Sequence, residues 1–122
     1  MKHFLGIEDE EFIRGKVPMT KKEIRILTLA GAKIGKNDIV CDIGAGTGSL
    51  SIEAALLAKA GHVYAVERKK EAVELIRQNA AKFGIENITI IESEAPAGLE
   101  RLPEQLDAAI IGGTGSHLEE IL

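Results

Sequence analysis

Short apolar runs alternate with longer stretches of helical periodicity along most of this chain. The apolar runs predict strands at residues 39–43, 62–67, 88–92 and 108–111. Apolar positions spaced three and four residues apart predict helices from residue 20 to 34, 49 to 60 and 69 to 83, a short helical connection at 96–102, and a final helix at 118–122. Strands that alternate with helices favour right-handed crossovers and one parallel sheet.

The boundary residues of these helices carry their own signals. Thr20 and Glu23 have the spacing of a capping box, and the helix that follows is expected to bury one face. That face comprises Ile24, Leu27, Ala30 and Ile34. Gly61 and Gly84 stand where the second and third helices are expected to end, since glycine adopts the left-handed conformation at helix C-termini.

The predicted fold class is α/β, a Rossmann-like parallel sheet with strand order 3-2-1-4. That order results if the first two crossovers wind in the same direction, and the chain reverses between strands one and four. In such sheets ligands bind beyond the carboxyl ends of the strands at the reversal point. We divide the single domain into an N-terminal helical segment, 1–36, and a Rossmann-like core, 37–122.

A glycine motif follows the first predicted strand. Asp42, Gly44, Gly46 and Gly48 form a D-x-G-x-G-x-G pattern at the point where a strand passes into a helix. Such a turn brings bare backbone and helix N–H groups close to a ligand, although a tight turn without a ligand has the same composition. The dinucleotide fingerprint G-x-G-x-x-G would need a third glycine where Ser49 stands. The spacing instead resembles the first motif of methyltransferases that use S-adenosylmethionine (SAM).

Composition excludes several classes of function. The chain has 122 residues, a formal net charge of −4 and 3% aromatic residues, which argues against binding to nucleic acids. The single cysteine, Cys41, lies within an apolar strand, and no cluster has the spacing of a metal site. We expect a cytoplasmic protein without membrane contact, because no apolar run approaches membrane length.

Basic residues concentrate between residues 14 and 36, where Glu23 is the one acid. They are Arg14, Lys16, Lys21, Lys22, Arg25, Lys33 and Lys36. This segment is either a solvated helix face or a basic wall beside the cofactor site that attracts a polycarboxylate substrate.

Acidic residues at predicted strand ends are the candidate cofactor contacts. Glu67 ends the second strand, where a carboxylate can accept hydrogen bonds from a ribose diol or favour the following helix dipole. Glu92, Glu94 or the Ala95 amide could recognise an adenine edge, or the loop could simply be solvated. Asp42 either fixes the glycine loop through backbone amides or holds the cofactor's amino group. Thr20 is a helix cap or also a ligand contact.

Six stretches of the chain, taken together, resemble the decarboxylating precorrin methyltransferases of cobalamin biosynthesis, which act on carbon 15 of the macrocycle. The matching stretches are residues 9–14, Val17-Pro-Met-Thr20, Asp42 to Ser49, Tyr64-Ala-Val-Glu67, Glu94-Ala-Pro96 and Ile111-Gly-Gly-Thr-Gly115. The resemblance implies a class I methyltransferase that methylates and decarboxylates a carboxylate-rich tetrapyrrole. It implies SAM contacts at Thr20, Gly44, Ala45, Gly46, Thr47, Gly48, Glu67 and Ala95, and it requires no catalytic acid or base.

The chain departs from the family pattern at its C-terminal end. The family usually has Ser where Thr114 stands and Gly where Ser116 stands, and class I methyltransferases continue with further strands after the fourth. Without those strands, the apolar fourth strand would be a bare edge, so we expect a homo-oligomer. The alternative function is a non-catalytic SAM-binding module held together by self-association.

Overall fold

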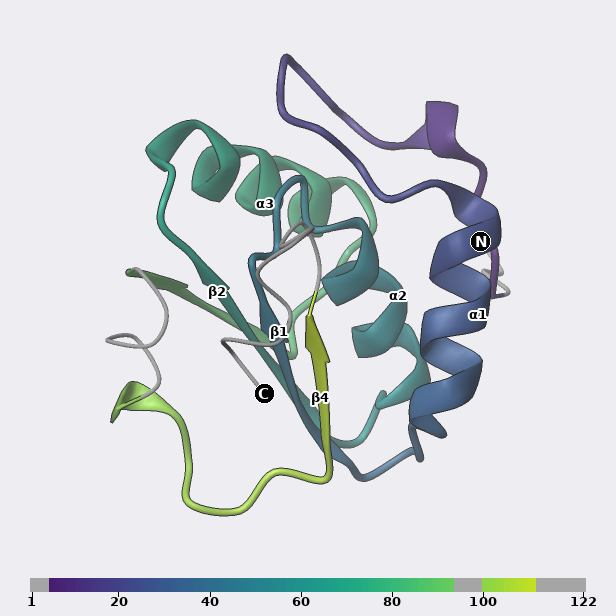
Figure 1. Ribbon diagram of the computed structural model, residues 1–122, viewed down its shortest axis with the longest axis vertical. Helices are drawn as coiled ribbons and strands as arrows, with labels where there is room; N and C mark the ends of the chain where they lie inside the picture. Colours follow the sequence, from purple (N-terminus) through teal and green to yellow (C-terminus); the bar gives the residue numbers. More distant parts are fainter. Residues whose placement is uncertain (1–4, 94–99, 112–122) are drawn as a thin grey trace.

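Four parallel strands form one sheet with the order β3-β2-β1-β4 (Figure 1). The computed structural model describes residues 5–93 and 100–111. The strands are β1 (Ile39–Ile43), β2 (His62–Glu67), β3 (Ile88–Glu92) and β4 (Ala108–Ile111). The helices are α1 (Lys22–Ala32), α2 (Ser49–Leu57) and α3 (Lys70–Lys82), and a 3-10 turn, η1, spans Asp9–Glu11. The predicted strand order and the four predicted strand ranges are confirmed.

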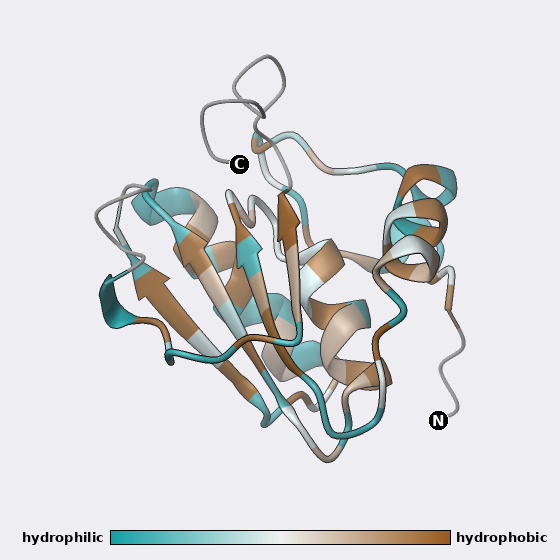
Figure 2. Ribbon diagram, turned by 60° about the horizontal axis from the view of Figure 1, so that its bottom comes forward, coloured by the Kyte–Doolittle hydropathy of each residue, from teal (hydrophilic) through white to brown (hydrophobic). Residues whose placement is uncertain are grey.

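The three helices lie on one face of the sheet; in Figure 2, α2 and α3 lie behind the strands and α1 stands to their right. Both crossovers, β1-α2-β2 and β2-α3-β3, step in the same direction, so a right-handed connection places both helices on the same side. Helix α1 packs against α2 and β4. On the opposite face Cys41, Ile43, Val66 and Ile91 form a separate apolar cluster, against which Leu102 packs.

The main core lies between the sheet and the helices. Leu29, Val40, Val63 and Ile110 meet there with three alanines of the segment from α2 into its C-cap, at positions 54, 55 and 58. The small alanine side chains allow α2 to lie close to the sheet. All of β1 except its first residue is buried, as expected for a central parallel strand covered on both faces.

The predicted start of α1 is wrong, and of its predicted buried face only Ile34, which lies beyond the end of the helix, packs against the main core. The helix begins at Lys22, and its N-cap residue Lys21 makes no capping hydrogen bond through its side chain. The Lys22 amide instead donates to Asp9 Oδ1 at 3.0 Å. The cap therefore comes from η1 and not from a Thr20–Glu23 box. Ile24 and Leu27 are 53% and 69% exposed, whereas the buried residues of α1 are Arg25 and Leu29. Hydrophobic periodicity missed this face because its central residue is an arginine whose charge is neutralised inside the protein.

The two glycines assigned to helix ends have different roles. Gly84 has φ +65° and its amide donates to Ala81 O, while the next amide donates to Ala80 O, which confirms the predicted helix stop. Helix α2, however, already ends at Leu57. A Cβ atom at Gly61 would lie 2.0 Å from the Asp38 carbonyl oxygen, so Gly61 permits close approach of two backbone segments.

Several expectations fall outside the described residues. They concern residues 96–99 of the predicted connection, Gly112 and Gly113, and the final helix at 118–122. Within the described part of the chain, no helix has the length and apolar character needed to cross a membrane.

Candidate functional site

The turn between β1 and α2 depends on its three glycines. Gly44, Gly46 and Gly48 have φ values of +72°, +58° and +87°, and Gly48 is the N-cap residue of α2. Residues with a side chain adopt this left-handed region only at a cost of roughly 1–2 kcal/mol each. Alternating glycines therefore let the chain turn sharply from the sheet into the helix while its backbone stays accessible.

Strand β2 holds this glycine loop in place. The amides of Gly44 and Ala45 donate to Val66 O at 2.9 and 3.1 Å, and the Gly46 amide donates to Glu67 Oε1 at 2.9 Å. The other carboxylate oxygen of Glu67 accepts the amide of Lys69, the N-cap residue of α3, at 2.9 Å. Glu67 therefore joins the glycine loop to the start of α3. It lies at a helix N-terminus, as one of its two predicted roles requires, and it also contacts the loop.

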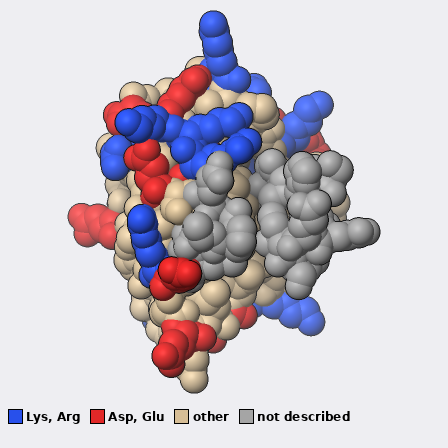
Figure 3. All heavy atoms as spheres, turned by 60° about the vertical axis from the view of Figure 1, so that its left-hand side comes forward, with Lys and Arg blue, Asp and Glu red and all other residues tan. Residues whose placement is uncertain are grey.

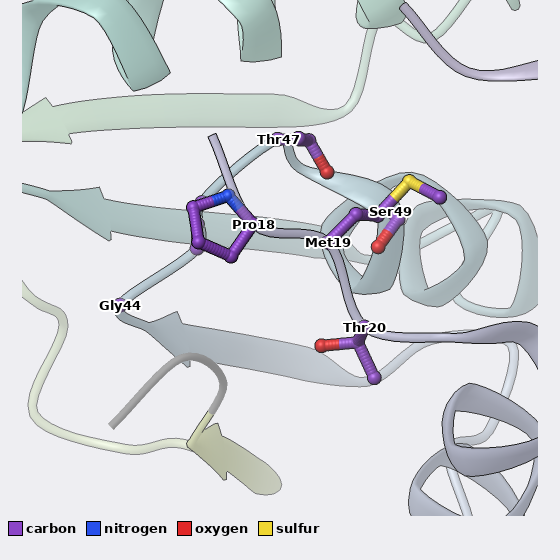
Figure 4. A pocket seen from close by; sticks show the side chains of 8 residues that line it. Pro18, Met19, Thr20, Gly44, Thr47 and Ser49 are labelled. Atoms are coloured by element: carbon purple, nitrogen blue, oxygen red, sulfur yellow. The ribbon is translucent and has the colours of Figure 1, made fainter. Parts of the chain in front are cut away.

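A pocket of about 180 Å³ lies between this loop and the extended segment that leads into α1 (Figure 4). We call residues 13–20 the strap. The strap forms one wall of the pocket with Pro18, Met19 and Thr20. The opposite wall consists of Gly44, Ala45, Gly46, Thr47 and Ser49. A Cβ atom at Gly46 would lie 3.3 Å from Pro18 O, so the strap crosses directly over the loop.

Two polar atoms beside the loop are buried without a hydrogen-bond partner among the described residues, Thr47 Oγ1 and Asp42 Oδ1. The other oxygen of Asp42, Oδ2, accepts a hydrogen bond from Ser51 Oγ at 2.6 Å. Burial raises the pKa of Asp42 to about 7; the Ser51 hydrogen bond opposes this shift and the Glu67 charge adds to it. Buried polar groups without partners are costly in proteins and so indicate that something else satisfies them.

The structure changes the interpretation of Asp42. Its expected role of fixing the glycine loop through backbone amides is wrong for Gly44, Ala45 and Gly46, whose amides bond to β2 instead. The reason is geometric, because Asp42 lies on the helix-facing side of β1 and its side chain points to α2. Its alternative role, toward the cofactor's amino group, stays a prediction.

Most of the predicted cofactor-binding residues lie at this one edge of the sheet. Thr20 and four residues of the glycine loop line the pocket, while Gly48 is buried at the start of α2 and Glu67 ends β2. Glu94 and Ala95 lie outside the described residues, and Glu92 is exposed at the end of β3. Sequence reasoning did not assign Pro18, Met19 and Ser49 to the site. The Pro-Met-Thr stretch predicts extended chain, because the residue before a proline avoids the helical region, but no local pattern indicates that this segment crosses the glycine loop.

The predicted basic wall is wrong in part. Arg25 is fully buried, Lys22 pairs with Glu8 at 2.9 Å, and Lys33 and Lys36 lie before β1 at the other edge of the sheet. Tertiary structure instead brings exposed basic residues from two segments to the carboxyl edge. They are Arg14 and Lys16 of the strap and Arg68, Lys69 and Lys70 after β2, where Gly15 lies against Glu71 and Leu75 of α3. Figure 3 shows Lys and Arg side chains gathered in the upper part of the molecule.

Known proteins are similar to this chain over almost its whole length. A family model described as precorrin methyltransferase domain matches residues 11–121. A protein of Sulfolobus acidocaldarius named as a probable cobalt-precorrin-6B C(15)-methyltransferase (decarboxylating) is 53% identical over 119 residues, 96% of this chain and 62% of that protein. A similarly named protein of Saccharolobus solfataricus is 46% identical and is covered to 60% of its length.

Solved structures agree with these relatives. A precorrin-6y C5,15-methyltransferase from Geobacter metallireducens has a TM-score of 0.87 and 43% identity, over 96% of this chain and 61% of that one. A protein-L-isoaspartate O-methyltransferase with 20% identity and a TM-score of 0.69 shares the fold alone, over 82% of this chain and 32% of that one. The sheet order, the glycine loop and these matches agree, and the chain belongs to the precorrin methyltransferase domain family.

Proposed function

We propose that this chain binds SAM and forms the cofactor-binding part of a methyltransferase that methylates carbon 15 of a precorrin or cobalt-precorrin and removes a ring acetate carboxylate. The chain spans about 60% of the length of the relatives that it matches. The observation that carries the proposal is a pocket at the carboxyl edge of the sheet, lined by bare glycine backbone and by Thr47, whose buried hydroxyl has no partner among the described residues.

The residues of the pocket fit this cofactor. Gly44 and Gly46 have positive φ values and carry no side chain, so a ligand can approach the backbone of the loop closely. Thr47 Oγ1 has no hydrogen-bond partner within residues 5–93 and 100–111. An ionised carboxylate has about four acceptor positions, and Glu67 uses two of them for backbone amides of this part of the chain. Glu67 can therefore still accept hydrogen bonds from a ribose diol.

When bound, SAM supplies a methyl group that its sulfonium centre has already activated. The contribution of the chain is then alignment of the reacting atoms and exclusion of water. The strap and the glycine loop provide the two walls for this purpose, and no residue is assigned as a catalytic acid or base.

The pocket would hold only part of the cofactor. Its volume of about 180 Å³ lies below the range of about 300–1,000 Å³ that is usual for small-molecule sites. The remainder of the cofactor would extend past Glu67 toward the carboxyl end of β3, where Glu94 and Ala95 follow in the sequence. The exposed basic residues around this edge suit a substrate that carries many carboxylates.

Calorimetric titration with SAM, with S-adenosylhomocysteine and with NAD tests the proposal. We expect the first two ligands to bind and NAD not to bind, because Ser49 replaces the third glycine of the dinucleotide fingerprint. NAD binding as tight as that of SAM would overturn the proposal. Methyl transfer to a precorrin, measured with labelled SAM, then tests the reaction.

Three variants locate the cofactor. Thr47→Val replaces by a methyl group a hydroxyl that has no partner among the described residues, so it should weaken SAM binding while leaving the stability of the free protein unchanged or higher. Glu67→Ala should weaken binding by about 1.5–3 kcal/mol. Gly46→Val should abolish binding, because its side chain would press on Pro18 O and strain the left-handed backbone. Glu86→Ala, an exposed acid in the loop before β3 at the opposite edge, is the control that should change nothing.

A second proposal concerns self-association. Within the described residues, β4 pairs with β1 on one side only, so its other edge could pair with a second copy of the chain. Sedimentation at micromolar concentration tests this, and a stable monomer would refute it.

A non-catalytic SAM-binding module is the alternative function, and SAM binding without methyl transfer would support it. Ile110→Lys cannot probe the edge, because Ile110 is only 2% exposed within the core of a single chain.

A further inference from the structure

Asn79 of α3 connects two segments that are far apart in the sequence. Its side chain is fully buried. Its Oδ1 accepts the Ile13 amide at 2.7 Å, and its Nδ2 donates to Ile13 O at 2.9 Å and to Thr47 O at 2.9 Å. One side chain therefore satisfies both backbone groups of a strap residue and a carbonyl of the glycine loop. Asparagine suits this task, since its amide combines an acceptor with two donor hydrogens.

The two segments that Asn79 joins are the two walls of the pocket. Ile13 begins the strap, which reaches the pocket at Pro18, Met19 and Thr20, and Thr47 belongs to the loop on the opposite wall. The side chain of Ile13 is 38% exposed, so Ile13 itself is held by its backbone hydrogen bonds, whereas the preceding Phe12 is buried in the core. The other end is held at Thr20, whose carbonyl accepts a hydrogen bond from Arg25 Nη1 at 2.6 Å.

We propose that Asn79 is a positioning residue that fixes the separation between the strap and the glycine loop and thereby preorganises the cofactor pocket. The inference rests on the proposed function of that pocket as a SAM site. Asn79 does not line the pocket itself and acts through Ile13 and Thr47. Its contact with Thr47 O also orients the residue that carries the unpartnered hydroxyl.

Loss of the Asn79 hydrogen bonds to Ile13 and Thr47 reduces the fraction of chains whose pocket has the geometry that binds the ligand. The apparent dissociation constant of a ligand rises in proportion, because it equals the intrinsic constant divided by the competent fraction. If the competent fraction falls to about one tenth, binding weakens about tenfold without any change in a residue that touches the ligand.

The experiment compares Asn79→Ala with Asn87→Ala. Asn87 is a matched control, because its Nδ2 also donates to two carbonyls, Ala55 O at 3.1 Å and Ala58 O at 2.9 Å, but it lies away from the pocket. Thermal unfolding and titration with S-adenosylhomocysteine are measured for both variants and for the unmodified chain. Both variants should unfold at lower temperature, but only Asn79→Ala should weaken ligand binding, by about tenfold. Equal affinities of the two variants would overturn the inference.

A second pair of variants avoids the core altogether. Ile13→Pro removes the amide hydrogen that Asn79 Oδ1 accepts, together with the Ile13 side chain. Phe12 already has the extended conformation that a following proline requires, with φ −90° and ψ 145°. Ile13→Ala keeps that amide and removes the half-exposed side chain. Weaker ligand binding by Ile13→Pro but not by Ile13→Ala would support the positioning role of Asn79, and equal affinities of the two variants would contradict it. If the unmodified chain itself fails to bind the ligand, the proposed function fails, and the positioning role fails with it.

Discussion

The guanidinium of Arg25 and the carboxylate of Glu53 form an ion pair inside the protein, with 2.8 Å between Nε and Oε2. Their side chains are 0% and 1% exposed. Glu53 Oε1 also accepts the amides of Gly6 and Ile7, and Arg25 donates to Ile7 O and Thr20 O and pairs with Asp9 at 2.8 Å. The pair thus joins α1, α2 and the N-terminal segment that leads to the strap.

Removal of one partner of this pair should be strongly destabilising. Glu53→Ala leaves the Arg25 charge without its buried partner, which costs about 3–5 kcal/mol in proteins. Urea denaturation measures the free energy of unfolding. Arg77→Ala is the control, since Arg77 and Glu74 are 58% exposed and 3.5 Å apart, and exposed pairs contribute about 0–1 kcal/mol. A Glu53→Ala variant as stable as Arg77→Ala would contradict a structural role for the pair.

Two glycine-to-alanine changes should have opposite effects on stability. At Gly61 the new Cβ would lie 2.0 Å from Asp38 O and 2.8 Å from Asp38 N, both backbone atoms, so the variant should be destabilised. At Gly31, in α1, nothing lies within 4 Å, and alanine should stabilise the helix by about 0.5–1 kcal/mol. Thermal unfolding of both variants checks the pair, and a neutral Gly61→Ala would show that the two backbone segments can separate.

Asp42 should make the stability of the protein depend on pH. Its pKa in the folded protein is about 7, against an ordinary value of 3.8, because it is buried. Between these values the folded state keeps the proton and the unfolded state releases it, so the contribution of Asp42 to stability is greatest below pH ~4 and declines as pH rises toward ~7. The stability difference between the unmodified chain and Asp42→Asn should follow this decline. A difference that is constant from pH 4 to 8 would contradict the raised pKa.

The thiol of Cys41 should be unreactive in the folded protein. Burial, with a smaller contribution from Asp42, raises its pKa to about 12, so almost no thiolate forms near neutral pH. Labelling with a disulfide reagent should be complete in concentrated guanidinium chloride and very slow without denaturant. Because Cys41 is the only cysteine, the labelling rate reports on opening of the sheet alone. Rapid labelling of the native protein would show that β1 is accessible.

The sequence by itself determined the strands, their order and the edge of the sheet at which most of the predicted site residues meet. Apolar runs identify buried parallel strands directly, and the left-handed turn between β1 and α2 requires glycines that a sequence displays openly. The position of Glu67 beside the glycine loop was also predictable, because the carboxyl ends of parallel strands share one edge.

Tertiary structure alone decided the contacts between distant segments. Periodicity predicted an apolar α1 face, yet Arg25 is buried there because Glu53, 28 residues later, compensates its charge. The cap of α1 comes from Asp9, the pocket gains a wall from Pro18 and Met19, and Asn79 bonds to Ile13 across 66 residues. These interactions depend on partners that only the folded chain brings together, so no local pattern of residues reveals them.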